Sequence, residues 1–318
     1  MSFTRRQLLA AGMAAALLPR LVRAEDGKPA PAEPTAPFPP ETTAEAVTAG
    51  LNLSGRTMLV TGATSGIGLE ITRVLALRGA RVIGTARSFE DGRATHAALS
   101  GRIDTVALDL ADFDSVRACA ARVRDLAPTL DALVCNAGIV LGDWQQVRGI
   151  EKQFVVNHLG HFLLVDELLA QVTDAPAGRV VVLGSGDHRN APPGGIQFDD
   201  LSGRSWQRRG YAHSKLANGL FSLELARRLR GTRATSNCMT PGHTRTNILR
   251  HTGNRYGDNA RSVAQGAATP CYVAVHPAMA NVSGAYLRDF VPAEQSVEQQ
   301  DAVAAKRLWD VSVALTLA

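Results

Sequence analysis

The sequence predicts an α/β fold in which a doubly wound parallel sheet lies between two layers of helices, a three-layer α/β/α arrangement. Short apolar runs alternate with helical patterns from residue 51 onwards. Several of these runs hold consecutive apolar residues, which is typical of strands buried on both faces. A glycine-rich stretch at 61–68 joins the first run to the first helical pattern, as in a dinucleotide-binding turn. Together these features predict a Rossmann-type fold.

Six strands are expected in chain order. They are the runs at 57–60, 81–85, 103–107, 130–135, 179–183 and 235–239. Helices are expected after the first run (Ile67, Ile71, Val74, Leu75), after Asp112 as a cap, over about 149–171 and over 211–229. Because strands alternate with helices, right-handed crossovers should pair the strands in parallel.

The N-terminal fifty residues are expected to lie outside this domain. Residues 1–24 carry Arg5 and Arg6 before an apolar stretch too short to span a bilayer, which resembles a twin-arginine signal peptide. A plain secretory signal or an uncleaved membrane anchor is the alternative. Residues 25–50 are rich in Pro and Ala and predict an extended linker without a core. The domain is therefore assigned to 51–318, exported to the periplasm, with no stable membrane span in the mature chain.

The composition is that of a globular protein, with 45% hydrophobic and 20% charged residues and a net charge of +5. Basic residues are concentrated near the N-terminus and do not cluster with aromatic residues, so no nucleic-acid partner is indicated. The cysteines lack C-x-x-C spacing, which favours buried free thiols over disulfides and predicts no metal site. Four histidines are also not assigned to a metal, because of their spacing and the absence of carboxylate partners. They are His158, His161, His188 and His213.

The turn at 61–68 has features that suit a bound pyrophosphate. Gly62 permits a tight turn, Gly66 lets the backbone approach a ligand, and Gly68 lets the helix pack closely. The helix N-terminus offers free N–H groups and the positive end of the helix dipole. An ordinary glycine-rich turn is the alternative, because such a motif is weak evidence by itself.

Several motifs occur in the order found in short-chain dehydrogenases/reductases, a family that the chain resembles over about residues 55–318. They are Thr61-Gly62-x3-Gly66-Ile67-Gly68, Asp109-Leu110, Asn136-Ala137-Gly138, Asn157, Ser185, Tyr211-x3-Lys215, and Pro241-Gly242 with Thr246. Residues 157–162, 211–218 and 307–310 look most like the retinol-dehydrogenase-like group. The resemblance implies a nicotinamide-dependent oxidoreductase, a lipophilic alcohol or carbonyl substrate, and a homo-oligomer.

The resemblance also implies a catalytic set of Asn157, Ser185, Tyr211 and Lys215. Tyr211 and Lys215 are four residues apart, so a helix places them on one face. A nearby ammonium should lower the tyrosine pKa, so that Tyr211 can exchange a proton with a substrate oxygen held by Ser185. Asn157 would support a water-linked proton path to Lys215. The implied cofactor contacts are Thr61, Gly62, Ser65, Gly66, Ile67, Gly68, Arg87, Asp109, Leu110, Asn136, Ala137, Gly138, Tyr211, Lys215, Pro241, Gly242 and Thr246.

The end of the second strand indicates which nicotinamide cofactor is used. An acidic residue there would bind the ribose 2′-hydroxyl of NAD, but this chain has Ala86 followed by Arg87. A guanidinium suits a 2′-phosphate, so NADP is favoured over NAD. Arg87 as an ordinary solvated charge is the alternative.

Two other functions compete with turnover of a carbonyl or alcohol. A serine hydrolase would need glycine at the positions of Leu183 and Asp187 around Ser185, and it is disfavoured for that reason. An NADP-binding sensor without turnover is the second alternative. The sequence does not identify the substrate or the reaction direction, although 187–209 and 243–262 are expected to shape the pocket.

Overall fold

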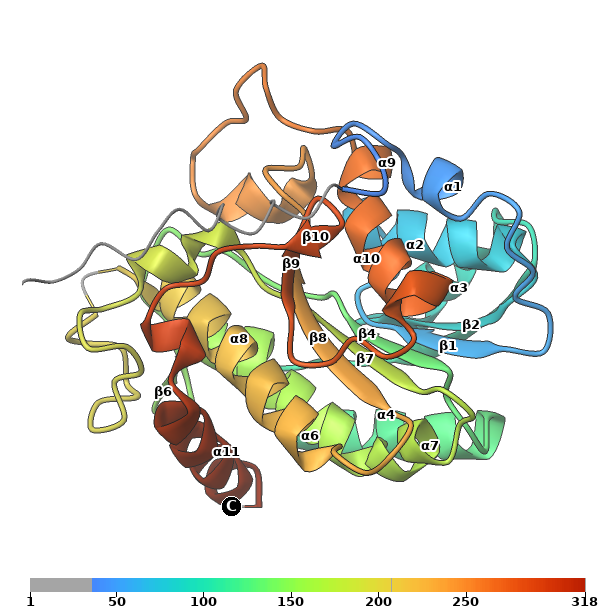
Figure 1. Cartoon of the computed structure of the whole chain (residues 1–318). Helices are drawn as coiled ribbons and strands as arrows, with labels where there is room; N and C mark the ends of the chain where they lie inside the picture. The colour runs from blue at the N-terminus through green and yellow to red at the C-terminus, as the bar shows by residue number, and fades with distance from the viewer. Residues whose placement is uncertain (1–35, 207, 318) are drawn as a thin grey trace, which may run out of the picture. The chain divides into compact units, whose positions relative to one another are not determined.

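The computed structural model describes residues 36–206 and 208–317, so the signal-peptide prediction for residues 1–24 lies outside the described residues. An eight-stranded sheet with the order β10-β9-β8-β7-β4-β1-β2-β3 forms the centre of the domain (Figure 1). Every neighbouring pair is parallel except β9 and β10. The predicted doubly wound parallel sheet is therefore confirmed.

Six of the strands are the predicted apolar runs, with ends shifted by no more than a few residues. They are β1 Thr57–Val60, β2 Arg81–Ala86, β3 Arg102–Ala107, β4 Ala132–Cys135, β7 Arg179–Leu183 and β8 Thr235–Thr240. The strands β9 Tyr286–Arg288 and β10 Val291–Pro292 extend the sheet beyond them. Runs of three and two residues are too short to show a pattern in the sequence. Asp289 and Phe290 make the tight turn between them, both with positive φ (51° and 71°).

Helices cover both faces of the sheet. On one face lie α4 Phe113–Leu126, α6 Gly160–Glu167, α7 Leu169–Thr173, α8 Gly210–Arg228 and α11 Ala302–Leu317; on the other lie α1 Ala44–Val47, α2 Gly66–Leu77, α9 Val263–Gly266 and α10 Ala268–Val275 (Figure 1). The helix α3 Phe89–Ala97 packs on β2 and β3. Successive strand residues point to opposite faces, so Leu59 enters one hydrophobic core while Met58 and Val60 enter the other. This explains why the central strands β1, β4 and β7 are apolar along most of their length.

Short elements complete the chain, mostly at the loops that follow the strands. They are the hairpin β5 Gln146–Val147 with β6 Ile150–Glu151, α5 Lys152–Phe154, the π-helical turn η1 Val155–Leu159, and the 3-10 turns η2 Gly186–Asn190, η3 Asn247–His251, η4 Pro277–Met279 and η5 Glu298–Gln300. The predicted Asp112 cap of α4 is confirmed, because its side chain accepts from the Asp114 N–H.

The continuous helix predicted over 149–171 is wrong. Residues 150–151 belong to the hairpin, and the Glu151 side chain caps α5 by accepting from the Phe154 N–H at 2.8 Å. The π-helical turn follows, with a bond from the Gly160 N–H to the Val155 carbonyl. Leu168, with φ −112° and ψ 9°, then separates α6 from α7. Apolar periodicity runs through all these pieces, so the pattern does not reveal the breaks.

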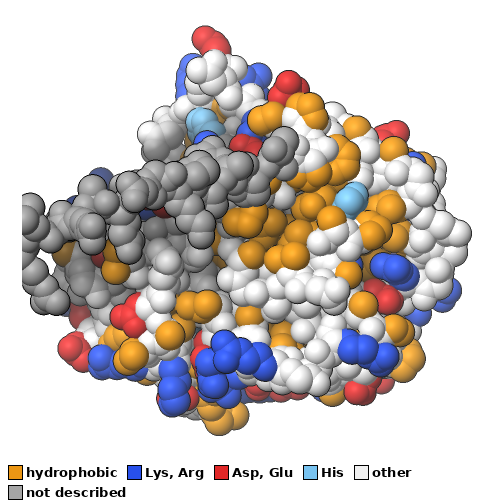
Figure 2. Space-filling model, in the orientation of Figure 1, with side chains coloured by type: hydrophobic (Ala, Val, Ile, Leu, Met, Phe, Trp, Pro, Cys, Tyr) orange, Lys and Arg blue, Asp and Glu red, His pale blue; other side chains and the backbone are white. Residues whose placement is uncertain are grey.

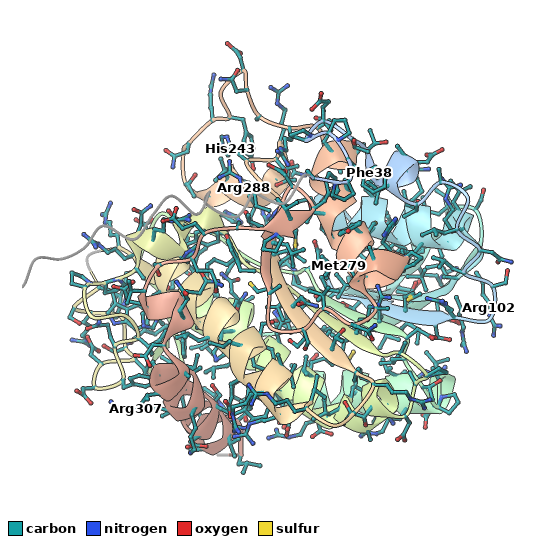
Figure 3. The ribbon with its side chains drawn as sticks, in the orientation of Figure 1. Phe38, Arg102, His243, Met279, Arg288 and Arg307 are labelled. Atoms are coloured by element: carbon teal, nitrogen blue, oxygen red, sulfur yellow. The ribbon has the colours of Figure 1, made fainter. Side chains whose placement is uncertain are left out.

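The segment 36–50, predicted as part of a linker without a core, instead packs on the domain. Ala44 and Val47 of α1 are 0% and 2% exposed within the core shared with α2 and α10. The ring of Phe38, labelled in Figure 3 on the side where α10 lies, is 5.5 Å from the ring of Phe290. Glu45 pairs with Arg73 of α2 at 2.9 Å. The folded unit therefore begins before residue 51. The Pro/Ala-rich composition of this segment does not reveal the three apolar side chains that pack on the domain.

The surface and the cysteines test the predictions that were based on the composition. On the face drawn in Figure 2, Lys and Arg side chains lie in separate groups among apolar and uncharged side chains. Within 36–206 and 208–317, none of the helices combines the length and the apolar character needed to cross a membrane. Cys119, Cys135, Cys238 and Cys271 are buried and free, as predicted. Burial raises the pKa of the Cys238 thiol to about 12, which keeps it protonated.

Candidate active site

The four predicted catalytic residues come together beyond the carboxyl ends of β4 and β7. Tyr211 and Lys215 lie in the first two turns of α8, with the Lys215 Nζ 5.7 Å from the centroid of the Tyr211 ring. Ser185 follows β7, and its hydroxyl lies close enough to Tyr211 to act against the rise of the phenol pKa. A Cβ on Gly138 would lie 3.3 Å from Asn157 Oδ1 and 3.8 Å from Lys215 Nζ, so both side chains border the same space.

The side chain of Asn157, in the π-helical turn, clamps the loop after β4 to α8. Its Oδ1 accepts from the Ile139 N–H at 2.8 Å, and its Nδ2 donates to the Ile139 carbonyl at 3.0 Å. The same Nδ2 donates to Ser214 Oγ at 2.9 Å, and Ser214 donates to the Tyr211 carbonyl at 2.7 Å. Asn157 is fully buried, so its amide positions the catalytic helix through these contacts.

Burial controls the pKa values of the catalytic pair. It lowers the pKa of Lys215 to about 8, and the ammonium donates to the Leu183 carbonyl at 2.8 Å. It raises the pKa of Tyr211 to about 12, against the hydrogen bond with Ser185, while the nearby Asp187 and Tyr256 raise it further. The expected lowering of the Tyr211 pKa by Lys215 is therefore not seen, because the ammonium is directed at a backbone carbonyl.

The glycine-rich turn is built around close backbone approach. Gly62 and Gly66 have positive φ, 66° and 52°, which disfavours other residues. A Cβ on Gly68 would overlap the Gly62 carbonyl oxygen and Asn136 Nδ2. Ser65 caps α2 without a side-chain hydrogen bond, so its hydroxyl remains available at the helix N-terminus, and the next residue but one, Ile67, packs against the core.

Thr61 is placed differently from the prediction of a direct cofactor contact. Its side chain is fully buried, and its Oγ1 accepts from the N–H groups of Asn136 and Ala137 at 2.9 Å each. Its own N–H donates to the Val134 carbonyl, and its carbonyl accepts from Asn136 Nδ2 at 2.8 Å. All its polar groups are engaged within the protein, so a cofactor contact by Thr61 is not supported. Thr61 joins the glycine-rich turn to the loop after β4.

The remaining predicted cofactor residues border the same end of the sheet. Arg87 follows β2 and is exposed, and Asp109 is exposed two residues after β3. Leu110 is 5% exposed and its side chain belongs to the hydrophobic core. Leu110 also touches Gly160, whose Cβ would overlap the Leu110 carbonyl oxygen.

The loop after β8 closes the site from the opposite side. It contains Pro241, Gly242 and Thr246, all partly exposed. Thr246 faces the start of α2, since a Cβ on Gly66 would lie 3.2 Å from its Cγ2. Its hydroxyl is 3.2 Å from the Tyr256 hydroxyl. The two glycine-containing loops therefore lie directly against each other.

These features fit a bound nicotinamide dinucleotide. The N-terminus of the twelve-residue helix α2 can bind a pyrophosphate. Beside it lie the Ser65 hydroxyl, which makes no capping bond, and glycine backbone without side chains. Arg87 is exposed directly after β2, at the same end of the sheet. No group of three or more metal-ligating side chains was found in the described part of the chain.

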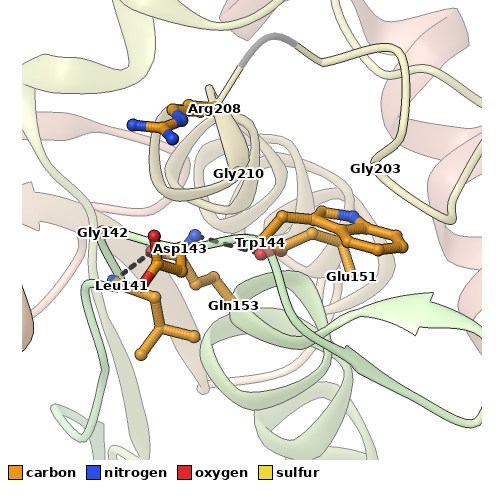
Figure 4. A pocket seen from close by; sticks show the side chains of 9 residues that line it. All are labelled: Leu141, Gly142, Asp143, Trp144, Glu151, Gln153, Gly203, Arg208 and Gly210. Atoms are coloured by element: carbon orange, nitrogen blue, oxygen red, sulfur yellow. Dashed lines mark hydrogen bonds between the residues drawn. The ribbon is translucent and has the colours of Figure 1, made fainter.

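A small pocket beside the first residue of α8 contains a buried carboxylate that the sequence does not single out (Figure 4). Glu151 is 2% exposed and accepts from Gln153 Nε2 at 3.0 Å, and Gln153 in turn accepts from the Leu141 N–H at 2.9 Å. Burial raises the pKa of Glu151. A Cβ on Gly210 would lie 2.7 Å from the carboxylate, so the hairpin, the loop after β4 and α8 meet here.

Three buried histidines also touch the catalytic elements. His188 Nδ1 donates to the Ser185 carbonyl at 2.7 Å, and its Nε2 accepts from the Ser296 N–H at 3.3 Å. His213 Nε2 accepts from the Gln197 N–H at 3.0 Å and stacks on Trp206. His161 lies between Thr61 and Asn157. The sequence places these residues beside the motifs, and only the structure shows what they bind.

Comparisons with known proteins agree with this geometry. A sequence profile described as short chain dehydrogenase matches residues 56–257. The short-chain dehydrogenase TIC 32 B, chloroplastic, of Brassica napus is 37% identical over 295 residues, covering 86% of this chain and 92% of the relative. Retinol dehydrogenase 13 of Homo sapiens is 36% identical over 288 residues, covering 83% and 85%.

Solved structures show the same fold. An uncharacterized protein from Mycobacterium Paratuberculosis superposes with a TM-score of 0.70 at 33% identity, covering 86% of this chain and 97% of that chain. The RhlG/NADP active-site complex of Pseudomonas aeruginosa superposes with a TM-score of 0.59 at 27% identity, covering 74% and 95%. The similarity thus spans the sheet and both layers of helices.

Proposed function

The chain belongs to the short-chain dehydrogenase family, within its retinol-dehydrogenase-like group, and from this premise we propose that it is an NADP-dependent enzyme that interconverts a carbonyl compound and an alcohol. Oxidoreductase activity follows from the family. The observation that carries the finer proposal is that Ser185 and Lys215 both lie beside Tyr211, and that Lys215 borders Gly138 together with Asn157.

The proposed chemistry assigns Tyr211 the proton. Bound NADP(H) supplies or accepts the hydride at the substrate carbon. Hydride addition to a carbonyl leaves negative charge on oxygen, which a proton must neutralise. Because burial raises its pKa, the Tyr211 phenol is protonated at neutral pH and can donate in the direction of reduction. The Ser185 hydroxyl can hold the same oxygen, and the buried Lys215 ammonium keeps a positive charge near it.

The cofactor preference rests on the residues after β2. Ala86 offers no carboxylate to a ribose 2′-hydroxyl, and the Arg87 guanidinium is exposed next to it. The similar RhlG structure is a complex with NADP, which agrees with a 2′-phosphate. Several relatives are named retinol dehydrogenases, which supports a lipophilic alcohol or carbonyl as the substrate class. The family's usual assembly supports a homo-oligomer.

A screen of the purified protein against carbonyl compounds tests this proposal. NADPH or NADH is supplied, and oxidation is followed at the nicotinamide absorbance. We expect carbonyl-dependent oxidation that is faster with NADPH. Tight NADPH binding without turnover of any alcohol or carbonyl would contradict the proposal and favour a sensor.

We also propose that the protein is exported folded to the periplasm, with residues 1–24 as a twin-arginine signal and the mature chain starting near Glu25. The support is the Arg5-Arg6 pair and the need to load a cofactor during folding. Arg5→Lys with Arg6→Lys should leave uncleaved precursor in the cytoplasm. Cell fractionation measures this, and wild-type periplasmic levels of the variant would contradict export by this route.

A further inference from the structure

His161 is buried between the glycine-rich turn and the catalytic turn. It lies in the first turn of α6 and is 2% exposed. Its Nε2 is 2.9 Å from Thr61 Oγ1, and its Nδ1 is 3.1 Å from the Asn157 carbonyl oxygen. One imidazole therefore bonds the element that begins the cofactor site and the element that carries a catalytic-set residue.

The direction of each hydrogen bond follows from the chemistry of the partners. A carbonyl oxygen only accepts, so His161 Nδ1 must carry the proton and donate it to Asn157. In a neutral ring Nε2 is then an acceptor, and the Thr61 hydroxyl donates to it at 2.9 Å in preference to the Val134 carbonyl, which lies farther away at 3.3 Å. Thr61 Oγ1 is left with two lone pairs, and these accept from the Asn136 and Ala137 N–H groups. Burial lowers the pKa of His161 to about 4, which keeps the ring neutral.

The contacts of His161 reach both sides of the site. On one side it reaches the loop after β4 through Thr61. On the other side Asn157 continues it through Ser214 to the Tyr211 carbonyl at the start of α8. The bond from His161 ends at the Asn157 backbone carbonyl and the bond to Ser214 starts from the Asn157 side chain, so Asn157 itself joins the two arms. Loss of the imidazole would leave the buried Asn157 carbonyl without this donor.

We propose that His161 is a positioning residue that couples cofactor binding to catalysis, holding the glycine-rich turn through Thr61 and the catalytic turn through Asn157. The inference rests on the proposed oxidoreductase function. It predicts separable effects, because one ring nitrogen serves the cofactor side and the other serves the catalytic side.

Three variants of the full chain separate the two nitrogens. His161→Leu removes both bonds at similar volume, and we expect kcat to fall and the Kd for NADPH to rise, each about tenfold. His161→Asn keeps a donor near the Nδ1 position and should restore kcat but not Kd. His161→Gln keeps a polar group near the Nε2 position and should restore Kd but not kcat. NADPH titration, steady-state kinetics and the melting temperature are measured for each.

His158→Leu is the matched control. His158 lies in the adjacent π-helical turn, is 1% exposed, and its Nε2 bonds Ser312 of α11 rather than a residue of the site. This variant should lower the melting temperature while leaving kcat and Kd near the wild-type values.

The outcomes divide clearly. Opposite rescue by Asn and Gln supports the proposal. Variants that lower only the melting temperature, or Asn and Gln variants that match His161→Leu in both parameters, would overturn it. If the wild type reduces no carbonyl, the proposed function fails, and the NADPH titration alone decides: a weaker Kd for His161→Leu and His161→Asn than for His161→Gln supports the coupling, and equal values overturn it.

Discussion

The two sides of the ligand edge of the sheet are built in different ways. On the dinucleotide side, the loops after β1, β2 and β3 contain glycine, which has no side chain, and exposed polar residues. Examples are Gly66, Ser65 and Arg87. On the catalytic side, the elements around β4, β7 and α8 use buried side chains that bond one another, such as Asn157 and Ser214. The dinucleotide side therefore leaves space for a ligand, whereas the geometry of the catalytic side is fixed before a ligand binds.

Replacing the phenol tests the catalytic side most severely. Tyr211→Phe removes the proposed proton donor and should lower kcat by about 100- to 10,000-fold, the usual contribution of acid–base catalysis. The Kd for NADPH should change little, because the glycine-rich turn is untouched. Steady-state kinetics and NADPH titration measure both. Retention of most of the activity would show that another group supplies the proton.

Acid should weaken the fold mainly through the catalytic side. Burial lowers the pKa values of His158, His161 and His213 to about 3, 4 and 3. The unfolded chain protonates them near their ordinary pKa of about 6.5, so their stabilising effect is complete above that pH and is lost as the pH falls towards 3–4. Below about pH 6 these three residues should together lower the free energy of unfolding by at most about 4 kcal/mol per pH unit, at about 1.4 for each residue.

Urea unfolding at pH 7 and pH 5 measures this fall. His213→Phe should reduce the slope by roughly one third, because one of the three groups is removed. A free energy of unfolding that is the same at the two pH values would contradict the burial of neutral histidines.

A change of charge tests the dinucleotide side. Ala86→Asp with Arg87→Ala removes the proposed 2′-phosphate partner and adds a carboxylate. Losing a good charged contact should cost about 1.5–3 kcal/mol, roughly a tenfold to hundredfold loss in NADPH affinity, with a gain for NADH. Titration with each cofactor gives the ratio. An unchanged ratio would place recognition of the 2′ position elsewhere.

A single methyl group tests the tight packing of the glycine-rich turn. Gly68→Ala would overlap the Gly62 carbonyl, and we expect a loss of about 1–3 kcal/mol in stability. Gly257→Ala is the control, since nothing lies within 4 Å of its Cβ position and its φ is not positive. The two melting temperatures are compared. Equal values would mean that the turn can relax around the added methyl group.

The sheet and the catalytic set could be predicted because their signals are local. Buried parallel strands read as apolar runs, and Tyr211 and Lys215 follow from helical spacing. The two edge strands were beyond prediction, since Tyr286–Arg288 and Val291–Pro292 are held by their neighbours rather than by a pattern. The packing of Phe38 was missed for the same reason, because its partners are more than 200 residues away.

Within the candidate site, residue types could be predicted better than contacts. Thr61 belongs to the glycine motif, yet its hydroxyl faces inward because two backbone N–H groups and His161 all form hydrogen bonds with it. The pKa of Tyr211 depends on burial and on where the Lys215 ammonium points, and neither follows from a spacing of four residues. Glu151 carries no motif, and its position depends on glycines at distant places in the chain.

The last strand of the sheet limits how copies of this chain can associate. The Ala293 N–H bonds the Tyr286 carbonyl, so alternation along the antiparallel pair turns residue 292 outward, and that residue is Pro292, which has no N–H. A strand approaching this edge would find no donor at that position. In the homo-oligomer proposed here, the subunits should therefore meet through side chains of helices and loops, and this edge should not continue from one subunit into the next.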